Sequence, residues 1–188
     1  MVDTVIYDAE LTLITPMELW LSTGIRALDH AVEGFLSPGE HPFNDVMALE
    51  AIRRLFDTLP RAKAAPKDAD IRTHNQLAAW FSFTLPRASA AGLSHTMGKQ
   101  IGARHEIPHG VTSCLLLPHV LRYLAQQTPE RAAALPSADA VQDLIVALDL
   151  PQHIAAYGIG EPELRRAADE LAGKYPAEDL LAIYLAAL

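Results

Sequence analysis

The stretch Gly92–Gly110, with the sequence GLSHTMGKQIGARHEIPHG, decides how the rest of the chain is interpreted. It contains three of the eight histidines and four of the ten glycines in a chain of 188 residues. Its last histidine stands directly between a proline and a glycine. A helix on the protein surface does not need this mixture. The histidines could bind a metal, a cofactor or an anionic substrate, or they could serve only the fold.

Helical patterns account for most of the other segments, because alanine and leucine dominate and β-branched residues are sparse. The sequence therefore predicts an all-α fold, a multi-helix bundle over residues 15–188. Neither a repeat nor a long linker divides this region. The expected helices cover residues 17–36, 44–59, 68–85 and 94–103, a longer helix from 109 with a kink at Pro118, and three or four shorter helices in the last third.

Local signals predict where several of these helices begin and end. Thr15, Pro16 and Glu18 have the pattern of a capping box, with the threonine as N-cap and the proline at the first helical position. Pro60 is expected to follow the end of the second helix, because proline interrupts a helix interior. Ser137 is expected to cap a helix in the last third.

The first 14 residues differ from the rest. Residues 4–12, TVIYDAELT, alternate apolar and polar side chains, which predicts a short N-terminal strand. A single strand is not stable alone, and few other segments resemble strands. We therefore interpret residues 1–14 as a strand and linker leading from an N-terminal domain that this sequence lacks.

Composition and charge exclude several classes of protein. The formal net charge is −8, and no basic stripe with aromatic residues is present, which argues against nucleic-acid binding. The sequence shows no leader peptide and no apolar run of about 18 residues, so neither secretion nor a membrane span is expected. A cytoplasmic location is the default. The one cysteine, Cys114, lies in an apolar run and is expected to be a buried, inert thiol.

Spacing alone suggests a shared site. Arg26 and His30 are one helical turn apart, as are His95 and Lys99, and His109 begins another predicted helix. Three helices could therefore direct His30, His95 and His109 to one point. Three imidazoles with an open position suit a catalytic transition metal. Hydrogen-bonded histidines in a helical interior would have the same spacing, so this pattern leaves both interpretations open.

Four segments, in order, resemble the C-terminal helical domain of the iron-containing alcohol dehydrogenase superfamily, within its maleylacetate reductase-like branch. The same helical fold occurs in dehydroquinate synthase-like proteins. The second segment is similar to the family helix Gly-x-Asp-Ala-x-x-His-Ala-x-Glu, and the third contains the histidine signature. The segments are VIYDAELTLITP (5–16), STGIRALDHAVEGFLS (22–37), GLSHTMGKQIGARHEIPHG (92–110) and VTSCLLLPHVLRY (111–123).

The resemblance implies an NAD(P)-dependent oxidoreductase that interconverts a CH–OH group and a carbonyl. Hydride would pass in a cleft between this helical domain and a nucleotide-binding domain, in the same or another chain. This sequence has no glycine-rich phosphate loop, so the main NAD(P) site would lie on that missing domain. The resemblance also implies a homodimer. His30, His95 and His109 match three of the usual ligands of iron or zinc.

Two positions depart from the family pattern. Arg26 occupies the place of the fourth ligand, usually an aspartate, and a guanidinium cannot bind a metal ion. Asp29 is a poor substitute, since it lies about 60° around the helix. Lys99 occupies a place where many members have a histidine. We therefore expect a metal-independent, maleylacetate-like reductase, in which Arg26, Lys99 and Arg104 attract a carboxylate-bearing oxo-acid.

In this hypothesis His95, Lys99 and Arg26 are catalytic, and His30 and His109 bind substrate with the cationic side chains. An iron- or zinc-dependent alcohol dehydrogenase half and a non-catalytic interaction or oligomerisation module are the alternatives. The chain could be a fragment, one half of a split enzyme or a repurposed module. Residues expected to be structural or exposed are His41, His74, His105, His119 and His153, and those expected in the core are Trp20, Trp80, Phe81 and Phe83.

Overall fold

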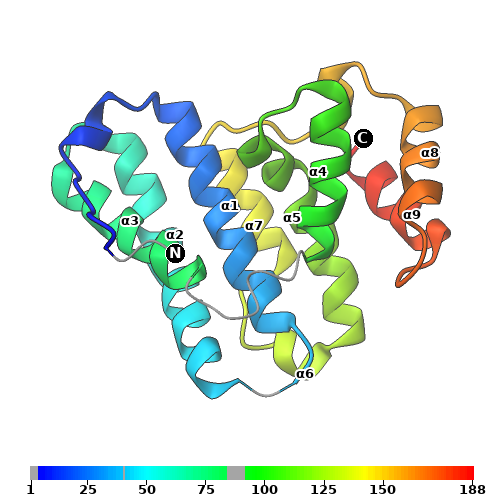
Figure 1. The fold of residues 1–188 in the computed structure, drawn as a ribbon, viewed down its shortest axis with the longest axis horizontal. Helices are drawn as coiled ribbons and strands as arrows, with labels where there is room; N and C mark the ends of the chain where they lie inside the picture. The colour runs from blue at the N-terminus through cyan, green and yellow to red at the C-terminus, as the bar shows by residue number, and fades with distance from the viewer. Residues whose placement is uncertain (1–3, 40, 84–91) are drawn as a thin grey trace.

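The computed structural model describes residues 4–39, 41–83 and 92–188, and every secondary-structure element in these ranges is helical (Figure 1). The all-α prediction is confirmed for them. The elements are η1 (Leu11–Ile14), α1 (Met17–Leu36), α2 (Pro42–Ala64), α3 (Ala69–Phe83), α4 (Leu93–His105), α5 (His109–Gln127), α6 (Pro129–Ala132), α7 (Ala138–Ala147), η2 (Ile154–Tyr157), α8 (Glu161–Leu171) and α9 (Ala177–Ala186).

The predicted N-terminal strand is not formed. Residues 4–8 have no regular structure, and the short 3-10 helix η1 follows. A strand needs a neighbour for its backbone groups, and the described part of the chain supplies none. Asp8 instead begins a turn, because its Oδ1 accepts a hydrogen bond from the Leu11 amide at 3.0 Å. Val5 and Ile6 are left exposed.

Two hydrophobic cores stabilise the bundle, and α5 contributes to both. The first core contains the buried faces of α1, α2 and α7, together with Cys114 and Leu117 of α5. The second contains α4, α8 and α9, together with Leu115 and Leu116 of α5. Figure 1 shows α2 and α3 at one end of the molecule and α8 and α9 at the other. Helix α5 therefore joins the two halves.

Three helix ends test the capping predictions. Helix α1 begins at Met17 with Pro16 as N-cap and no side-chain cap, so the capping box predicted at Thr15 is wrong. The Thr15 amide instead bonds back to Thr12 at the end of η1. Helix α2 continues through Pro60 to Ala64, because its last turns remain buried in the core. The Ser137 cap is confirmed by a 3.1 Å hydrogen bond to its Oγ from the Ala140 amide.

Within the described ranges, no helix is both long enough and apolar enough to cross a bilayer.

Candidate active site

Three histidines from three helices meet at one point. His30 lies on α1, His95 on α4, and His109 is the first residue of α5. The ring centroids of His30 and His95 are 5.2 Å apart, and those of His95 and His109 are 4.8 Å apart. All three side chains are half-buried. The structure thus brings together the three residues that the spacing argument selected.

A tight turn between α4 and α5 places His109 beside His95. Glu106 adopts a left-handed conformation with φ of 55°, and the Ile107 amide donates back to Gly102 O at 3.1 Å. Pro108 then begins α5. This connection brings the start of α5 back alongside α4, so His109, the last histidine of the signature, faces His95, the first.

Glycines in the signature permit close helix packing. A Cβ atom on Gly98 would lie 2.8 Å from Thr112 Oγ1 on α5. A Cβ atom on Gly110 would lie 2.8 Å from the Ser22 carbonyl group on α1. Contacts this short do not occur for real side chains, so these positions need glycine. Two of the four glycines therefore serve the contacts of α5 with α4 and α1.

Asp29 lies beside the histidine cluster and was not recognised from the sequence as a functional residue. Its Oδ2 accepts hydrogen bonds from Ser94 Oγ at 2.9 Å and from Ser113 Oγ at 2.8 Å. The side chain is only 2% exposed, and burial is the main reason that its pKa rises to about 6. A signal did exist, because Asp29 shares one helix face with the apolar residues Ile25 and Val32.

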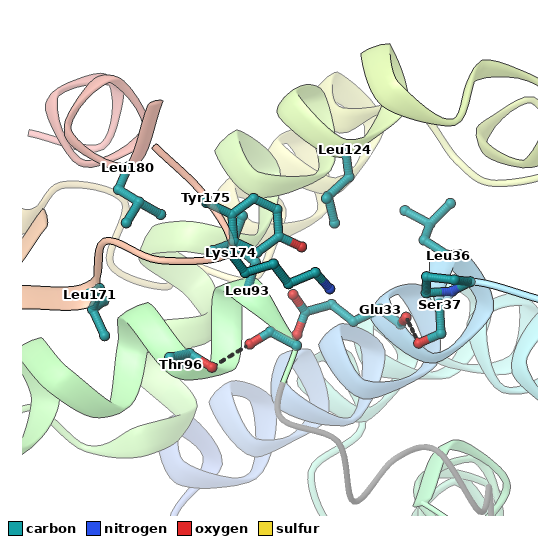
Figure 2. A pocket seen from close by; sticks show the side chains of 12 residues that line it. Glu33, Leu36, Ser37, Leu93, Thr96, Leu124, Leu171, Lys174, Tyr175 and Leu180 are labelled. Carbon is teal, nitrogen blue, oxygen red and sulfur yellow. Dashed lines mark hydrogen bonds between the residues drawn. The ribbon is translucent and has the colours of Figure 1, made fainter. Parts of the chain in front are cut away.

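Glu33, one turn further along α1, reaches the first turn of α4. Its carboxylate accepts hydrogen bonds from the backbone amides of Ser94 at 2.7 Å and His95 at 3.4 Å. A carboxylate at a helix N-terminus satisfies free amides and complements the helix dipole. Figure 2 shows the Glu33 side chain extending toward α4, at the edge of a cavity of about 390 Å³. A Cβ atom on Gly92 would overlap with this carboxylate.

Burial and nearby cations keep the histidines neutral. Burial is the largest cause that lowers the pKa of His30 and His95 to about 4, and the charges of Arg26 and Lys99 lower it further. The pKa of His109 is also lowered, for the same reasons. All three imidazoles are therefore uncharged near pH 7. Positive charge in the site comes from the two basic side chains.

Arg26 and Lys99 belong to the cluster, whereas Arg104 makes a different contact. Arg26 is half-buried, and its Nε lies 3.5 Å from His30 Nε2. Lys99 is exposed on α4, where its charge still acts on the histidines. Arg104 Nη2 pairs with Glu170 Oε2 on α8 at 2.7 Å. The structure therefore brings together two of the three predicted cations.

The donor set does not fit a divalent metal. The Arg26 guanidinium lies next to His30 Nε2, the nitrogen that a ligand would offer, and a fixed cation repels another. In the part of the chain that the structure describes, no group of three or more His, Cys, Asp or Glu side chains is arranged to hold a metal ion. Among the same residues, the buried His109 Nε2 lacks a hydrogen-bond partner, so it can serve a substrate.

Phe83 is a further residue of the site that sequence analysis assigned wrongly. Its ring is 66% exposed and stands edge-on to His30, with the centroids 5.8 Å apart. It was expected in the core, because aromatic residues near the end of an amphipathic helix usually pack inward. Apolar character alone could not distinguish a core ring from one beside a site.

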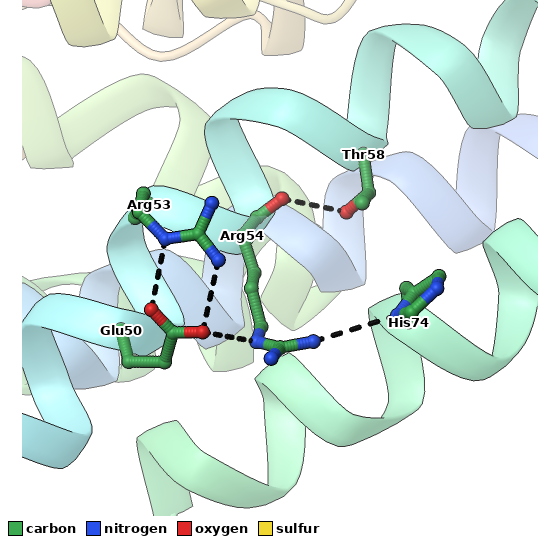
Figure 3. A network of polar contacts seen from close by, with 5 residues as sticks. All are labelled: Glu50, Arg53, Arg54, Thr58 and His74. Carbon is green, nitrogen blue, oxygen red and sulfur yellow. Dashed lines mark hydrogen bonds and ion pairs between the residues drawn. The ribbon is translucent and has the colours of Figure 1, made fainter.

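The remaining histidines and the cysteine lie outside the cluster. His74 is exposed and contacts Arg54, which binds Glu50 together with Arg53 on the surface of α2 (Figure 3). His153 is also exposed, while His41, His105 and His119 are half-buried. Cys114 is buried, and burial raises the pKa of its thiol, as expected for an inert core residue.

Known proteins are similar to this chain in sequence and in fold. Residues 20–177 match the model of the C-terminal domain of the Fe-containing alcohol dehydrogenase family. The chain belongs to this family. Maleylacetate reductase from Rhizobium sp. is 31% identical over 89% of this chain and 49% of its own length, and 1,3-propanediol dehydrogenase from Klebsiella pneumoniae is 31% identical over 84% and 46%.

A solved family structure shows the same fold. Maleylacetate reductase from Agrobacterium tumefaciens superposes with a TM-score of 0.90 and 29% identity, over 98% of this chain and 56% of that one. The chain thus spans about half the length of its family relatives. The resemblance inferred from the histidine segments is confirmed, including the similarity to maleylacetate reductases.

Proposed function

We propose that this chain forms the substrate-binding wall of an NAD(P)-dependent oxidoreductase that reduces an oxo-acid carrying carboxylate groups. The observation that carries the proposal is the pair of cations, Arg26 and Lys99, at three neutral histidines. Guanidinium and ammonium groups bind carboxylates through charge-assisted hydrogen bonds. The maleylacetate reductases among the relatives support this substrate class, because their named substrate is an oxo-dicarboxylate.

Different residues of the site bind the substrate and transfer the proton. NAD(P)H, when bound, supplies the hydride, and we assign its main site to a nucleotide-binding domain in the other half of the enzyme. Arg26 orients a carboxylate or polarises the carbonyl oxygen. Lys99 donates the proton that completes the reduction, because the three histidines are uncharged near pH 7. His30 and His109 contribute uncharged hydrogen-bonding groups, so they add no further charge to the site.

Arg26→Gln tests the proposal, because it removes the charge and keeps a polar side chain. The assay mixes this chain with the nucleotide-binding half of a maleylacetate reductase and follows NADH oxidation with maleylacetate. We expect kcat/KM to fall about 100-fold, the equivalent of about 3 kcal/mol, since a charged hydrogen-bonded contact is lost. Glu18→Gln, an exposed change on the same helix, should have no effect.

Two results would contradict the proposed substrate class. One is unchanged kcat/KM in Arg26→Gln. The other is faster turnover of 1,3-propanediol than of maleylacetate in the unmodified pair, since a neutral alcohol has no use for two cations. Either result would favour the alcohol dehydrogenase alternative.

Metal independence is a separate part of the proposal. Iron or zinc at one equivalent per chain in the purified protein would contradict it. Arg26→Asp sharpens the test, because it removes the cation and supplies a carboxylate one turn before His30. We expect its Zn²⁺ affinity, measured by calorimetry, to exceed that of the unmodified chain at least about 100-fold. Lys99→Gln removes a cation without adding a ligand and should give a smaller gain.

A further inference from the structure

Two acids on α1 hold α4 by different groups. Asp29 Oδ2 accepts the Ser94 hydroxyl at 2.9 Å, and Glu33 Oε1 accepts the Ser94 backbone amide at 2.7 Å. Glu33 also accepts the His95 amide at 3.4 Å. Ser94 is thus bound through its side chain and its backbone, one residue before a histidine of the site. On α1, Asp29 likewise stands one residue before a histidine of the site, His30.

In the part of the chain that the structure describes, α1 and α4 contribute their buried apolar residues to different cores. The buried apolar residues of α1 belong to the first core, whereas those of α4, such as Met97 and Ile101, belong to the second. Both helices pack on α5, which belongs to both cores. The direct contacts of α4 with α1 therefore include the His30–His95 ring contact and the hydrogen bonds of Asp29 and Glu33, and the two acids hold the first turn of α4.

We propose that Asp29 and Glu33 are positioning residues, which hold α4 on α1 so that His95 and Lys99 face His30 and Arg26. Their importance for catalysis rests on the proposed function, since it requires that these four residues bind one substrate. A displacement of about 1 Å in such a site can reduce a rate about 100-fold. The two acids act through the residues that they place, and neither needs to touch the substrate.

A matched pair of serine variants tests this proposal. Ser94→Ala and Ser113→Ala each remove one hydrogen bond to the same Asp29 oxygen, but only Ser94 links α1 to α4. The melting temperatures of the two variants should therefore fall by similar amounts. The first measurement is the nuclear Overhauser effect between the His30 and His95 rings, whose centroids are 5.2 Å apart. Ser94→Ala should weaken it, and Ser113→Ala should leave it unchanged.

Glu33→Gln provides the second test. The Ser94 amide bonds to Glu33 Oε1 and the His95 amide to Glu33 Oε2, whereas glutamine has a single oxygen and can accept only one of them. We expect a weaker His30–His95 effect in this variant. Glu18→Gln, at the exposed start of the same helix, is the control and should match the unmodified chain. Asp29→Asn retains groups that can bond both serines and should preserve the effect.

Binding of 2-oxoglutarate, a stable oxo-dicarboxylate, separates this proposal from the proposed function. Ser94→Ala should weaken binding about fivefold, the loss expected for one hydrogen bond, and Ser113→Ala should not weaken it. Equal ring contacts in all variants would overturn the positioning role, whether or not the probe binds. Failure of the unmodified chain to bind 2-oxoglutarate would contradict the proposed function. The His30–His95 ring contacts of the variants would still test whether Asp29 and Glu33 position α4.

Discussion

Two of the regions in which a carboxylate lies near an arginine have opposite electrostatic results. On α1, Asp29 is buried near Arg26, and burial raises its pKa to about 6. On α2, Glu50 is bound by Arg53 and Arg54 at the surface (Figure 3), and these contacts lower its pKa to about 2. Both acids have an arginine three residues away in sequence. The difference therefore lies in burial and in direct bonding.

Asp29 belongs to the candidate site, whereas Glu50 belongs to a network on the surface of α2. Glu50 pairs directly with both arginines, so its charged form is favoured. Asp29 has two serine hydroxyls as donors, and the charge of Arg26 is the smallest of the causes that act on its pKa, so desolvation outweighs the attraction. The charge of Arg26 also acts on His30 and His95, and in the proposed function it is available to a carboxylate of the substrate. Three variants test the contrast between the buried Asp29 and the exposed Glu50, and the first of them alters the packing of α5 against α1.

Gly110→Ala should have the largest effect, because it separates the helices that enclose the site. The new Cβ would lie 2.8 Å from Ser22 C and O and 2.9 Å from Thr23 N, all backbone atoms of α1. Overpacking against backbone that cannot rotate away should lower the free energy of unfolding by about 3 kcal/mol. Chemical denaturation measures this, and the His95–His109 ring contact should weaken as α5 moves.

Gly173→Ala is the matched control for this prediction. Its added Cβ would lie 4.0 Å from Leu171 O, an ordinary van der Waals contact, so the free energy of unfolding should change by less than about 0.5 kcal/mol. Equal stability of the two variants would mean that α1 and α5 can separate without cost. The burial of Asp29 would then not depend on close packing of α1 against α5.

Much of the fold could be predicted from the sequence, because helical periodicity and breakers are local signals. The helix bearing Arg26 and His30 was placed closely, and the family resemblance united His95 and His109 with them. The N-terminal strand was wrong, since strand formation depends on a partner that local alternation does not reveal. Pro60 was misread for a similar reason, because tertiary burial extended a helix past a local breaker.

The contacts within the site were harder to predict. Asp29 could have been recognised, since a carboxylate among core positions requires partners. Its partners Ser94 and Ser113 are distant in sequence, so spacing gives no indication of their contact. Arg104 looked like part of the cationic pocket, but its partner Glu170 lies on another helix. Long-range pairing of polar side chains depends on the three-dimensional arrangement of helices.

Asp29→Asn should change how stability depends on pH. The folded pKa of about 6 exceeds the ordinary value of 3.8, so the folded state holds the proton more tightly. Asp29 therefore contributes stability below pH 4, and this contribution is lost as the pH rises through 6. Relative to Asp29→Asn, the unmodified chain should lose on the order of 1–3 kcal/mol over this interval.

Denaturation of both proteins between pH 4 and 7 measures this difference. The lowered pKa values of His30 and His95 reduce stability as the pH falls from 6.5 toward 4, and they do so in both proteins. Their contribution therefore cancels in the difference. Because the charge of Asp29 also raises the pKa of Glu33, the difference reports the titration of these two buried acids together. Parallel stability curves would show that Asp29 is not desolvated, and would remove the contrast with Glu50.

Glu50→Gln should have the smallest effect and the opposite dependence on pH. The carboxylate binds Arg53 Nε at 2.8 Å and Arg54 Nε at 2.6 Å, but the Arg53 side chain is 65% exposed and water screens the pair. We expect a loss of about 0.5 kcal/mol at pH 7, reduced by salt. Because its folded pKa lies below 4.5, Glu50 contributes stability above that pH and loses it as the pH falls toward 2. A loss of stability that persists in 1 M salt would show that water and salt do not screen the Glu50 network. Exposure would then not explain why Glu50 and Asp29 differ.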